Sequence, residues 1–281
     1  MNTWKLNNGF ELPKVGLGTW EMGGGMETDT SEDELSLKAI RSALETGYRH
    51  IDTAEVYGDG HAEELVGEAT KDFNREELII ASKVAKTNLG YGDVLSAAER
   101  SLERLGMDYI DIYYIHAPNP EIPMEETMKA LNKLVDDGLI KHIAVSNFTV
   151  EMLEEAQRLA DTKIVANQIE YSLSAQIESN YRYNRDVISN VVPYCQENDV
   201  LVVAYRPINR RELLKPNEAL DKMAEKYGKT RAQIAINWLV SQKNVATIPM
   251  TQNEQHLRDN LDAGLWEMDT EDIAYLGEAY R

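Results

Sequence analysis

The sequence has few of the features that mark secreted or membrane proteins. Its 281 residues include one cysteine, Cys195, so no disulfide can form within the chain. No apolar run is long enough for a membrane-spanning helix, and the opening segment (MNTWKLNNG) has no apolar signal-peptide core. These absences are typical of the reducing cytoplasm, where we expect this protein to reside without a membrane partner.

Basic residues are also scarce. The chain has 29 Lys and Arg against 48 Asp and Glu, which gives a formal net charge of −19. Nucleic-acid binding requires a basic surface, so this balance argues against it and favours a solvated acidic surface. The chain has no H-x-H or H-E-x-x-H motif, which disfavours zinc-dependent hydrolysis, and we expect no metal site.

No low-complexity linker divides the sequence, and we expect one domain over residues 1–281. A short apolar strand, a loop and an amphipathic helix recur along it, which is typical of a parallel sheet. The predicted strands are Val15–Thr19, Arg49–Asp52, Leu78–Lys83, Tyr109–His116, His142–Asn147, Val165–Tyr171, Val200–Tyr205 and Val245–Pro249. The predicted helices include Glu32–Thr46, Gly92–Leu105, Met124–Asp137, Val150–Leu159 and Asn217–Gln242. Eight such strands close a (β/α)₈ barrel, the TIM-barrel fold.

The opening segment WKLNNGFELPKVG does not follow this alternation. Leu6 and Phe10 flank Asn8 and Gly9, a dipeptide typical of two-residue hairpin turns. We predict an N-terminal β-hairpin that closes the bottom of the barrel.

Polar or aromatic side chains stand where six of the predicted strands end. Active sites of (β/α)₈ barrels lie at the C-terminal ends of the strands, so these side chains are expected to share one rim. They are Asp52, Lys83, His116, Ser146 with Asn147, Gln168 and Tyr205. Tyr57 follows Asp52 in the same loop, and we expect both to meet Lys83 and His116 above the barrel.

An Asp–Tyr–Lys–His group suits the protonation of a carbonyl oxygen. A tyrosine has an ordinary pKa of about 10, and a nearby ammonium such as Lys83 is expected to lower that pKa. Asp52 can hold the lysine, and His116 can hydrogen-bond the substrate oxygen. Each residue alone also has a structural interpretation: a helix cap for Asp52, packing for Tyr57, a solvent-reaching chain for Lys83 and a loop contact for His116. Their convergence on adjacent strand ends favours catalysis.

With these residues, the sequence resembles the aldo-keto reductase superfamily over nearly its whole length. The matching segments are GLGTW, GYRHIDTAEVYG, IIASKV, LGMDYIDIYYIH, IAVSNF, NQIEYS, VVAYRP and IPMT. The resemblance implies an NAD(P)H-dependent carbonyl reductase with a catalytic tetrad of Asp52, Tyr57, Lys83 and His116. Tyr57 would be the general acid, Lys83 and Asp52 would tune it, and His116 would orient the carbonyl.

The resemblance also implies where the nicotinamide end of the cofactor binds. Ser146, Asn147 and Gln168 would hydrogen-bond its carboxamide, and Tyr205 would stack on its ring. The other residues assigned to cofactor contact, without a part of the cofactor being specified, are Thr19, Trp20, Asp52, Arg206 and Ile208. The chain has no G-x-G-x-x-G fingerprint, so the phosphates need other loops. Arg206, Arg210 and Arg211 are candidates, although relatives commonly carry serine where Arg206 stands, and a solvated basic turn is the alternative.

The adenine end departs from the family in its charges. Many relatives carry I-P-K-S and a later arginine, two cations that grip the 2′-phosphate of NADP(H). Met250 and His256 occupy those positions here, whereas Thr251 keeps the hydroxyl, and Asp259 with Asn260 match the pair that contacts adenine. We therefore expect NADP(H) as cofactor with NAD(H) also used, unless Arg258 or the Arg206–Arg211 cluster replaces the lost cations.

The substrate pocket implied by the resemblance is formed by Trp20, Tyr57, His116 and Ala117. Many relatives have tryptophan at the position of Ala117 and continue beyond the last helix, whereas this sequence ends with MDTEDIAYLGEAYR. Both differences predict an open, weakly selective pocket for an aldehyde or small ketone. Separately, we expect the protein to be a monomer.

Two rival functions remain open at the level of sequence. A Schiff-base aldolase would use Lys83 to form an imine and would need no nicotinamide. A cofactor-sensing subunit without catalysis, like the β subunits of potassium channels, would share the fold, although the complete tetrad argues against it.

Overall fold

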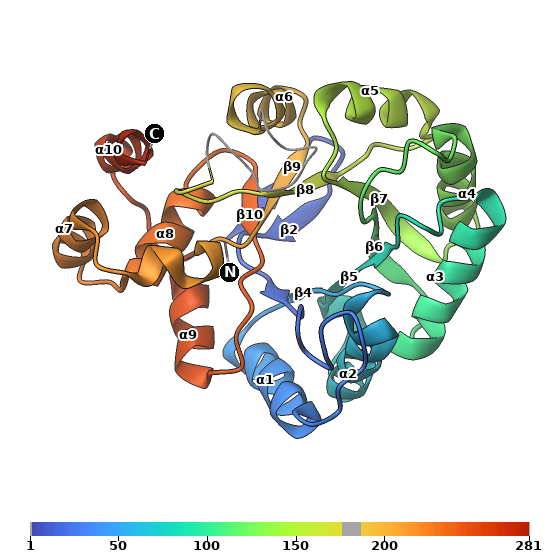
Figure 1. The fold of residues 1–281 in the computed structure, drawn as a ribbon, viewed down its shortest axis with the longest axis horizontal. Helices are drawn as coiled ribbons and strands as arrows, with labels where there is room; N and C mark the ends of the chain where they lie inside the picture. Colours follow the sequence, from blue (N-terminus) through green and yellow to red (C-terminus); the bar gives the residue numbers. More distant parts are fainter. Residues whose placement is uncertain (1, 176–186, 281) are drawn as a thin grey trace.

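The computed structural model describes residues 2–175 and 187–280. Within them, eight parallel strands follow one another around a single sheet, in the order in which they occur along the chain. They are β3 (Leu17–Gly18), β4 (His50–Asp52), β5 (Ile79–Val84), β6 (Ile110–Ile115), β7 (Ile140–Ser146), β8 (Ala166–Glu170), β9 (Leu201–Tyr205) and β10 (Val245–Thr247). In Figure 1 the strands surround the centre and the helices form an outer ring. The predicted (β/α)₈ fold is confirmed.

The sheet closes where its first strand meets its last. Val15 forms a parallel bridge with Thr247, whose N–H donates to Lys14 O at 2.9 Å. The Gly16 N–H donates to Thr247 O at 2.8 Å, and the Gly18 N–H donates to Pro249 O at 3.2 Å. These bonds bring the end of β10 beside the end of β3, so the rim is continuous.

The two faces of each strand contribute to two different cores, because side chains alternate along a strand. In β6, Ile112 and Tyr114 join a cluster inside the barrel, whereas Tyr113 and Ile115 join the larger cluster between the sheet and the helices. All four are fully buried. Apart from Asp111, the strand is therefore built of apolar and aromatic residues, as expected for a parallel sheet covered on both sides.

The helices surround the barrel in chain order, and most of them bury one apolar stripe against it. They are α1 (Asp33–Thr46), α2 (His61–Thr70), α3 (Tyr91–Leu105), α4 (Met124–Asp136), α5 (Val150–Leu159), α6 (Val192–Glu197), α7 (Glu218–Tyr227), α8 (Arg231–Val240), α9 (Glu254–Asp262) and α10 (Thr270–Ala279). The predicted ranges did not include α2, α6 or α9, whereas α10 lies in the segment MDTEDIAYLGEAYR, where the last helix was expected. Helix α10 packs beside α7, outside α8 (Figure 1).

The predicted helix over Asn217–Gln242 is wrong in one respect, since two helices occupy it. Helix α7 ends at Gly228, whose φ of 63° places it in the left-handed region that terminates helices. Helix α8 begins after Thr230, whose side chain accepts from the Gln233 N–H while the Gln233 side chain accepts from the Thr230 N–H. This capping box fixes a new helix start, and Gly228 followed by Thr230 and Gln233 was the local sequence signal that the predicted range passed over.

The N-terminal hairpin is present and closes the barrel bottom, as predicted. Strands β1 (Thr3–Lys5) and β2 (Glu11–Pro13) pair antiparallel around the Asn8–Gly9 turn. Leu6, Phe10 and Leu12 belong to the cluster inside the barrel, and the Phe10 ring meets the His142 ring edge-on at 4.6 Å.

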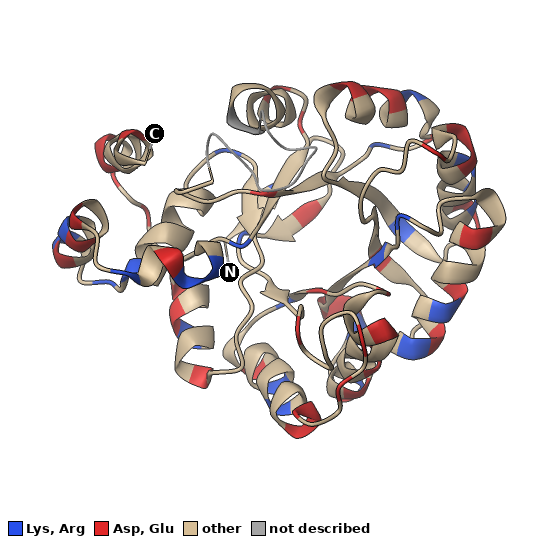
Figure 2. Ribbon diagram, viewed as in Figure 1, with Lys and Arg blue, Asp and Glu red and all other residues tan. Residues whose placement is uncertain are grey.

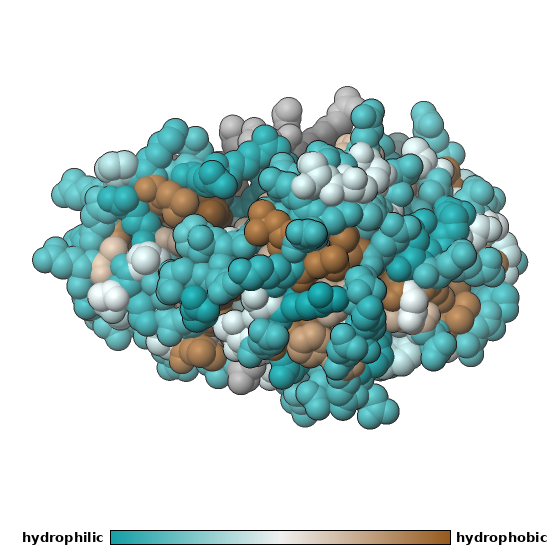
Figure 3. All heavy atoms as spheres, turned by 90° about the horizontal axis from the view of Figure 1, so that it is seen from below, coloured by the Kyte–Doolittle hydropathy of each residue, from teal (hydrophilic) through white to brown (hydrophobic). Residues whose placement is uncertain are grey.

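Charged residues lie mainly on the outer helices, and the strands carry few of them (Figure 2). The face drawn in Figure 3 is mostly hydrophilic, with apolar areas broken up by polar ones. Among the helices of the described segments, none combines the length and apolarity needed to cross a membrane.

The hairpin plug yields a stability prediction. Phe10 is 7% exposed, so Phe10→Ala removes a large buried ring and is expected to lower the free energy of unfolding by about 3–5 kcal/mol. Urea denaturation measures this. Lys5→Ala, in the same hairpin but exposed, is the control and should change the stability by less than about 0.5 kcal/mol. Equal effects of the two substitutions would mean that the hairpin does not seal the barrel.

Candidate active site

A buried ion pair forms the centre of the rim. Strand β4 ends at Asp52, and Lys83 lies one residue before the end of β5. The Lys83 side chain is 0% exposed and Asp52 is 1% exposed. Lys83 Nζ donates to Asp52 Oδ1 at 2.5 Å, to Thr53 O at 2.7 Å and to the Tyr57 hydroxyl at 3.3 Å. An ammonium has three donors, so all three are used.

The second oxygen of Asp52 is held from across the barrel. Gln168, near the end of β8, donates from Nε2 to Asp52 Oδ2 at 2.8 Å. The carboxylate thus accepts from two different strands, which fixes its plane. Because its neighbours are fixed as well, Lys83 has one defined position from which to reach Tyr57.

Tyr57 lies in a tight turn that glycine makes possible. The turn spans Tyr57–Gly60, and Gly58 has a φ of 57°. A Cβ at Gly58 would lie 2.2 Å from Gly23 O, so no other residue fits there. The Tyr57 ring meets Trp20 edge-on at 5.0 Å and His116 at 5.6 Å, which leaves Tyr57 9% exposed.

The expectation that Lys83 brings the pKa of Tyr57 below its ordinary value is wrong. Burial raises the pKa of the Tyr57 phenol, and the charge of Lys83 opposes this without reversing it. Burial also disfavours the charged form of Lys83, but Asp52 and Tyr57 outweigh it and raise the lysine pKa. Both groups therefore keep their protons at neutral pH.

His116 directly follows β6 and is uncharged. Burial, together with the positive charge of Lys83, lowers the pKa of His116 to about 3. A neutral imidazole keeps one N–H donor and one acceptor nitrogen, so His116 can donate a single hydrogen bond beside Tyr57. The described residues contain no group of three or more His, Cys, Asp or Glu side chains placed to hold a metal ion.

Two residues that hold this site in place were not predicted from the sequence. Thr53 offers its backbone carbonyl to Lys83, which no side-chain pattern can indicate. Glu55 is buried, and its Oε1 accepts from the Ala85 N–H at 2.6 Å and from Asn88 Nδ2 at 3.1 Å. It ties the loop that carries Tyr57 to the loop after β5. An acidic residue inside HIDTAEVYG was the available signal.

A second polar cluster lies at the ends of β7, β8 and β9. Asn147 Nδ2 donates to Ser146 Oγ at 3.0 Å, and Ser146 Oγ donates to Gln168 O at 2.9 Å. The Tyr205 hydroxyl donates to Asn147 Oδ1 at 2.9 Å. The side chains of Ser146, Asn147 and Tyr205 therefore contact one another, and Gln168 joins them through its backbone carbonyl while its side-chain amide reaches Asp52.

Arg206 is held by a buried carboxylate. Its Nη1 donates to Glu170 Oε1 at 3.1 Å, and Glu170 is 2% exposed. Arg206, Arg210 and Arg211 all have positive φ values, of 55°, 51° and 73°. Such backbone is costly for non-glycine residues. Arg210 and Arg211 are exposed, whereas Arg206 points to Glu170.

The positions assigned to the adenine end lie in another part of the rim. Met250 and Thr251 follow β10, and His256, Asp259 and Asn260 lie on α9. Met250 is 37% exposed and Asn260 is 7% exposed. The set falls within residues 250–260, apart in the chain from the tetrad, which is carried by β4, the turn that follows it, β5 and the residue directly after β6.

The remaining assigned positions differ in exposure. Thr19 is fully buried, and its Oγ1 donates to Asp52 O at 3.0 Å. Ile208 is partly buried against the core outside the barrel. Trp20 is 39% exposed, as a pocket wall would be, but Ala117 is 4% exposed. A large side chain at Ala117 would therefore need its neighbours to move.

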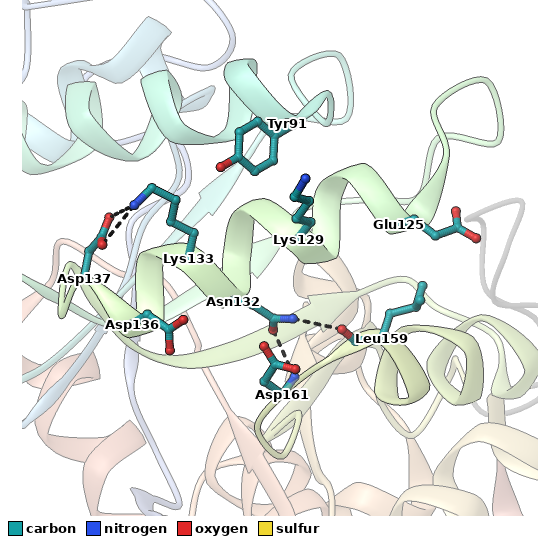
Figure 4. A pocket seen from close by; sticks show the side chains of 9 residues that line it. All are labelled: Tyr91, Glu125, Lys129, Asn132, Lys133, Asp136, Asp137, Leu159 and Asp161. Atoms are coloured by element: carbon teal, nitrogen blue, oxygen red, sulfur yellow. Dashed lines mark hydrogen bonds and ion pairs between the residues drawn. The ribbon is translucent and has the colours of Figure 1, made fainter.

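A hollow on the outer helices is a separate feature. It is lined by Tyr91, Glu125, Lys129, Asn132, Lys133, Asp136, Asp137, Leu159 and Asp161. Figure 4 shows charges of both signs along α4, with Lys133 paired to Asp137 at 2.8 Å. It lies on the helices rather than at the strand ends, and we assign it no ligand.

Comparison with known proteins agrees with this geometry. The family model described as "Aldo/keto reductase family" matches residues 14–281. The chain belongs to the aldo/keto reductase family. The match begins at Lys14 and thus includes every strand of the barrel and all four residues of the predicted tetrad.

Individual members resemble this aldo/keto reductase along nearly their whole length. The glyoxal reductase of Bacillus subtilis (strain 168) is 37% identical over 274 residues, covering 97% of this chain and 90% of that protein. The crystal structure of a thermostable aldo-keto reductase with the inhibitor epalrestat superposes with a TM-score of 0.90 at 41% identity, covering 99% and 100% of the two chains. That of a Klebsiella pneumoniae aldo-keto reductase with NADPH gives a TM-score of 0.86 at 32% identity, covering 99% and 95%.

The buried pair predicts a strong energetic coupling in this reductase. Lys83→Met leaves the Asp52 charge buried without its partner, and Asp52→Asn does the same to Lys83, so each should lower the free energy of unfolding by about 3–5 kcal/mol. The double variant should lose clearly less than the sum of the two. Urea denaturation of the three variants measures this.

The matched control is an exposed ion pair on the same scaffold. Lys133→Met removes the partner of Asp137, whose side chain is 42% exposed, and should cost less than about 1 kcal/mol. Additive costs at Lys83 and Asp52 would show that the two residues do not stabilise each other.

Proposed function

We propose that this protein reduces aldehydes and small ketones with NADPH, using Tyr57 as general acid. The contact that carries the proposal is the bridge made by Lys83, which donates to Asp52 and to the Tyr57 hydroxyl from a fully buried position. It sets a fixed positive charge beside the hydroxyl of Tyr57, whose ring lies between those of Trp20 and His116.

The polar cluster suits a nicotinamide. The amides of Asn147 and Gln168 and the hydroxyl of Ser146 offer the donors and acceptors that a carboxamide needs, and the Tyr205 ring lies beside them at the end of β9. When bound, the reduced nicotinamide supplies a hydride to the carbonyl carbon. The Klebsiella pneumoniae reductase with NADPH supports this choice of cofactor.

The residues of this chain then transfer one proton to the carbonyl oxygen. As negative charge develops on the carbonyl oxygen, Tyr57 donates its phenolic proton to that oxygen, and the phenolate that remains faces Lys83. Burial raises the pKa of Tyr57, so the donor is protonated at rest, and the ammonium stabilises it after transfer. Neutral His116 donates a hydrogen bond to the same oxygen and orients it.

The substrate class follows from the size and character of the wall. Trp20 and Tyr57 offer aromatic faces, and the name of the Bacillus subtilis relative points to small oxoaldehydes. A Schiff-base aldolase is disfavoured, because imine formation needs a neutral amine with a free lone pair. Lys83 is held as an ammonium with three acceptors around it.

Removing the phenol tests the proposal. Tyr57→Phe is expected to lower kcat for glyoxal or another small aldehyde by about 10²- to 10⁴-fold, because the ring remains and only the proton donor is lost. The dissociation constant of NADPH should stay nearly constant. Loss of absorbance at the reduced-nicotinamide band gives the rate. Tyr275→Phe, on exposed α10, is the control and should be fully active. Near-normal activity of the Tyr57 variant would exclude Tyr57 as the acid.

The second test concerns the 2′-phosphate. A lysine at Met250 would add a charge-assisted hydrogen bond, worth about 1.5–3 kcal/mol, or roughly 10- to 150-fold in affinity. We expect wild-type protein to bind NADPH and NADH with weak discrimination, and Met250→Lys to tighten NADPH while leaving NADH nearly unchanged. Dissociation constants at one ionic strength give the comparison.

Leu265→Lys is the matched control, since Leu265 is 52% exposed and the substitution adds the same charge. It should tighten neither cofactor. A wild-type protein that binds NADPH more than a thousandfold tighter than NADH would contradict this prediction, and Arg258, Arg210 and Arg211 would then be the cations to test.

A further inference from the structure

Two loops meet above the catalytic tyrosine. The first rim loop, residues 19–32, runs from the end of β3 to α1, and the tyrosine loop, residues 53–60, runs from β4 to α2. The Gly58 N–H donates to Gly25 O at 2.7 Å, and Thr28 Oγ1 donates to Gly58 O at 2.8 Å. Trp20, at the start of the first rim loop, contacts the Tyr57 ring. The position of this loop therefore shapes the wall beside the acid.

His61 joins the far ends of the same two loops. It is the first residue of α2, and its Nε2 lies 2.9 Å from Asp33 Oδ1 in the first turn of α1. Its Nδ1 lies 2.7 Å from Glu64 Oε2. The ring also packs under the first rim loop, since a Cβ at Gly23 would lie 2.9 Å from His61 Cδ2. One imidazole thus touches α1, α2 and the first rim loop.

Both contacts require the doubly protonated ring. A carboxylate only accepts hydrogen bonds, and a neutral imidazole has a single N–H, so a neutral His61 would set one bare nitrogen against an oxygen. Burial opposes the charged form, but the hydrogen bonds to Glu64 and Asp33 outweigh it and raise the pKa of His61 above 6.5. The charged groups against the ring are Asp33 from α1 and Glu64 from α2, while the first rim loop contributes uncharged Gly23.

We propose that His61, as an imidazolium, is a positioning residue that fastens the first rim loop over Tyr57 and thereby sets the affinity for the carbonyl substrate. It acts through Trp20 and touches neither substrate nor cofactor. The inference rests on the proposed reductase function, but the fastening itself is a property of the loops and can be measured without turnover.

The pH dependence has a defined sign. A histidine whose pKa is raised by folding contributes its full stabilisation below about pH 6.5, and loses it as the pH rises through the higher folded value. The fastening is therefore complete in mild acid and weakens in mild base. Glu64 is 56% exposed and can turn away, so a neutral ring can keep one bond to Asp33 and the loss is partial.

The experiment measures KM and kcat for an uncharged aldehyde from pH 5.5 to 9 at saturating NADPH. In wild-type protein we expect KM to rise roughly five-fold across this range, as for the loss of one partly exposed ion pair, with kcat following a separate profile. His61→Gln should have the high KM at every pH. His61→Arg keeps a cation that can reach both carboxylates, and should have the low KM at every pH.

Lys71→Gln is the matched control. It removes one positive charge from the pair with Glu68 at the other end of α2, and should leave the pH dependence of KM unchanged. If His61→Gln is unstable, Asp33→Asn replaces it and should raise KM in the same way. A KM profile in His61→Gln that matches wild type would overturn the proposal, as would a high KM in His61→Arg.

Hydrogen exchange separates this inference from the proposed function. Peptides covering residues 21–30 and 55–60 contain the Asp29 and Gly58 amides, which donate to Gly23 O and Gly25 O. After correction for intrinsic exchange, their protection should fall from pH 6 to pH 8.5 in wild type and be low throughout in His61→Gln. Constant protection would refute the fastening even in an active reductase, whereas an inactive wild type with the expected exchange would refute only the reductase assignment.

Discussion

The site depends on one buried charge pair. Placing Lys83 and Asp52 away from water carries a desolvation cost of several kcal/mol per ion, which their attraction offsets only when every remaining donor and acceptor is matched. The chain matches them with a carbonyl from Thr53, an amide from Gln168 and the hydroxyl of Tyr57. The same bonds that make the pair tolerable also fix the Tyr57 hydroxyl, the proposed acid, so stability and positioning arise from a single arrangement.

That arrangement explains why the barrel must close accurately. The pair itself comes from the adjacent strands β4 and β5, whereas Gln168 comes from β8 across the barrel, so its amide reaches Asp52 only if the sheet curls completely. The small residues inside the barrel, such as Ala81 and Ala144, leave room for this crossing near the rim. The packing of small side chains inside the barrel and the hydrogen bond from Gln168 to Asp52 at its rim thus both require the barrel to close.

The sequence predicts what depends on periodicity and on strand ends. All eight strands are found within about two residues of their predicted bounds, because apolar runs and their polar terminal residues are local signals. The tetrad follows from the same reasoning, since parallel strands bring their C-terminal ends to one rim. The resemblance to the aldo-keto reductases added roles that spacing alone leaves open.

The features that the sequence does not predict depend on competing effects in the folded structure and on contacts between distant residues. A pattern cannot weigh burial against charge, so the direction of the Tyr57 pKa came out opposite to the expectation. It cannot show that Arg206 has a buried partner in Glu170, whereas Gly228 and the Thr230–Gln233 capping box were readable signals for the break between α7 and α8. A sequence also cannot indicate hydrogen bonds to backbone atoms, such as the one from Lys83 to the carbonyl of Thr53.

The closure of the barrel has a further consequence for where the sheet can open locally. Strand β3 is two residues long and pairs with β4 at two positions, whereas β5 and β6 pair at four. The edge of the wall that leads to Trp20 is thus joined to β4 by fewer pairings than join the strand of Lys83 to β6, and local opening costs least where few bonds must break. An opening between β3 and β4 would carry Trp20 away from Tyr57 while the ion pair between β4 and β5 stayed intact. The space beside Tyr57 can therefore widen along β3 without exposing the charges of Lys83 and Asp52 to water.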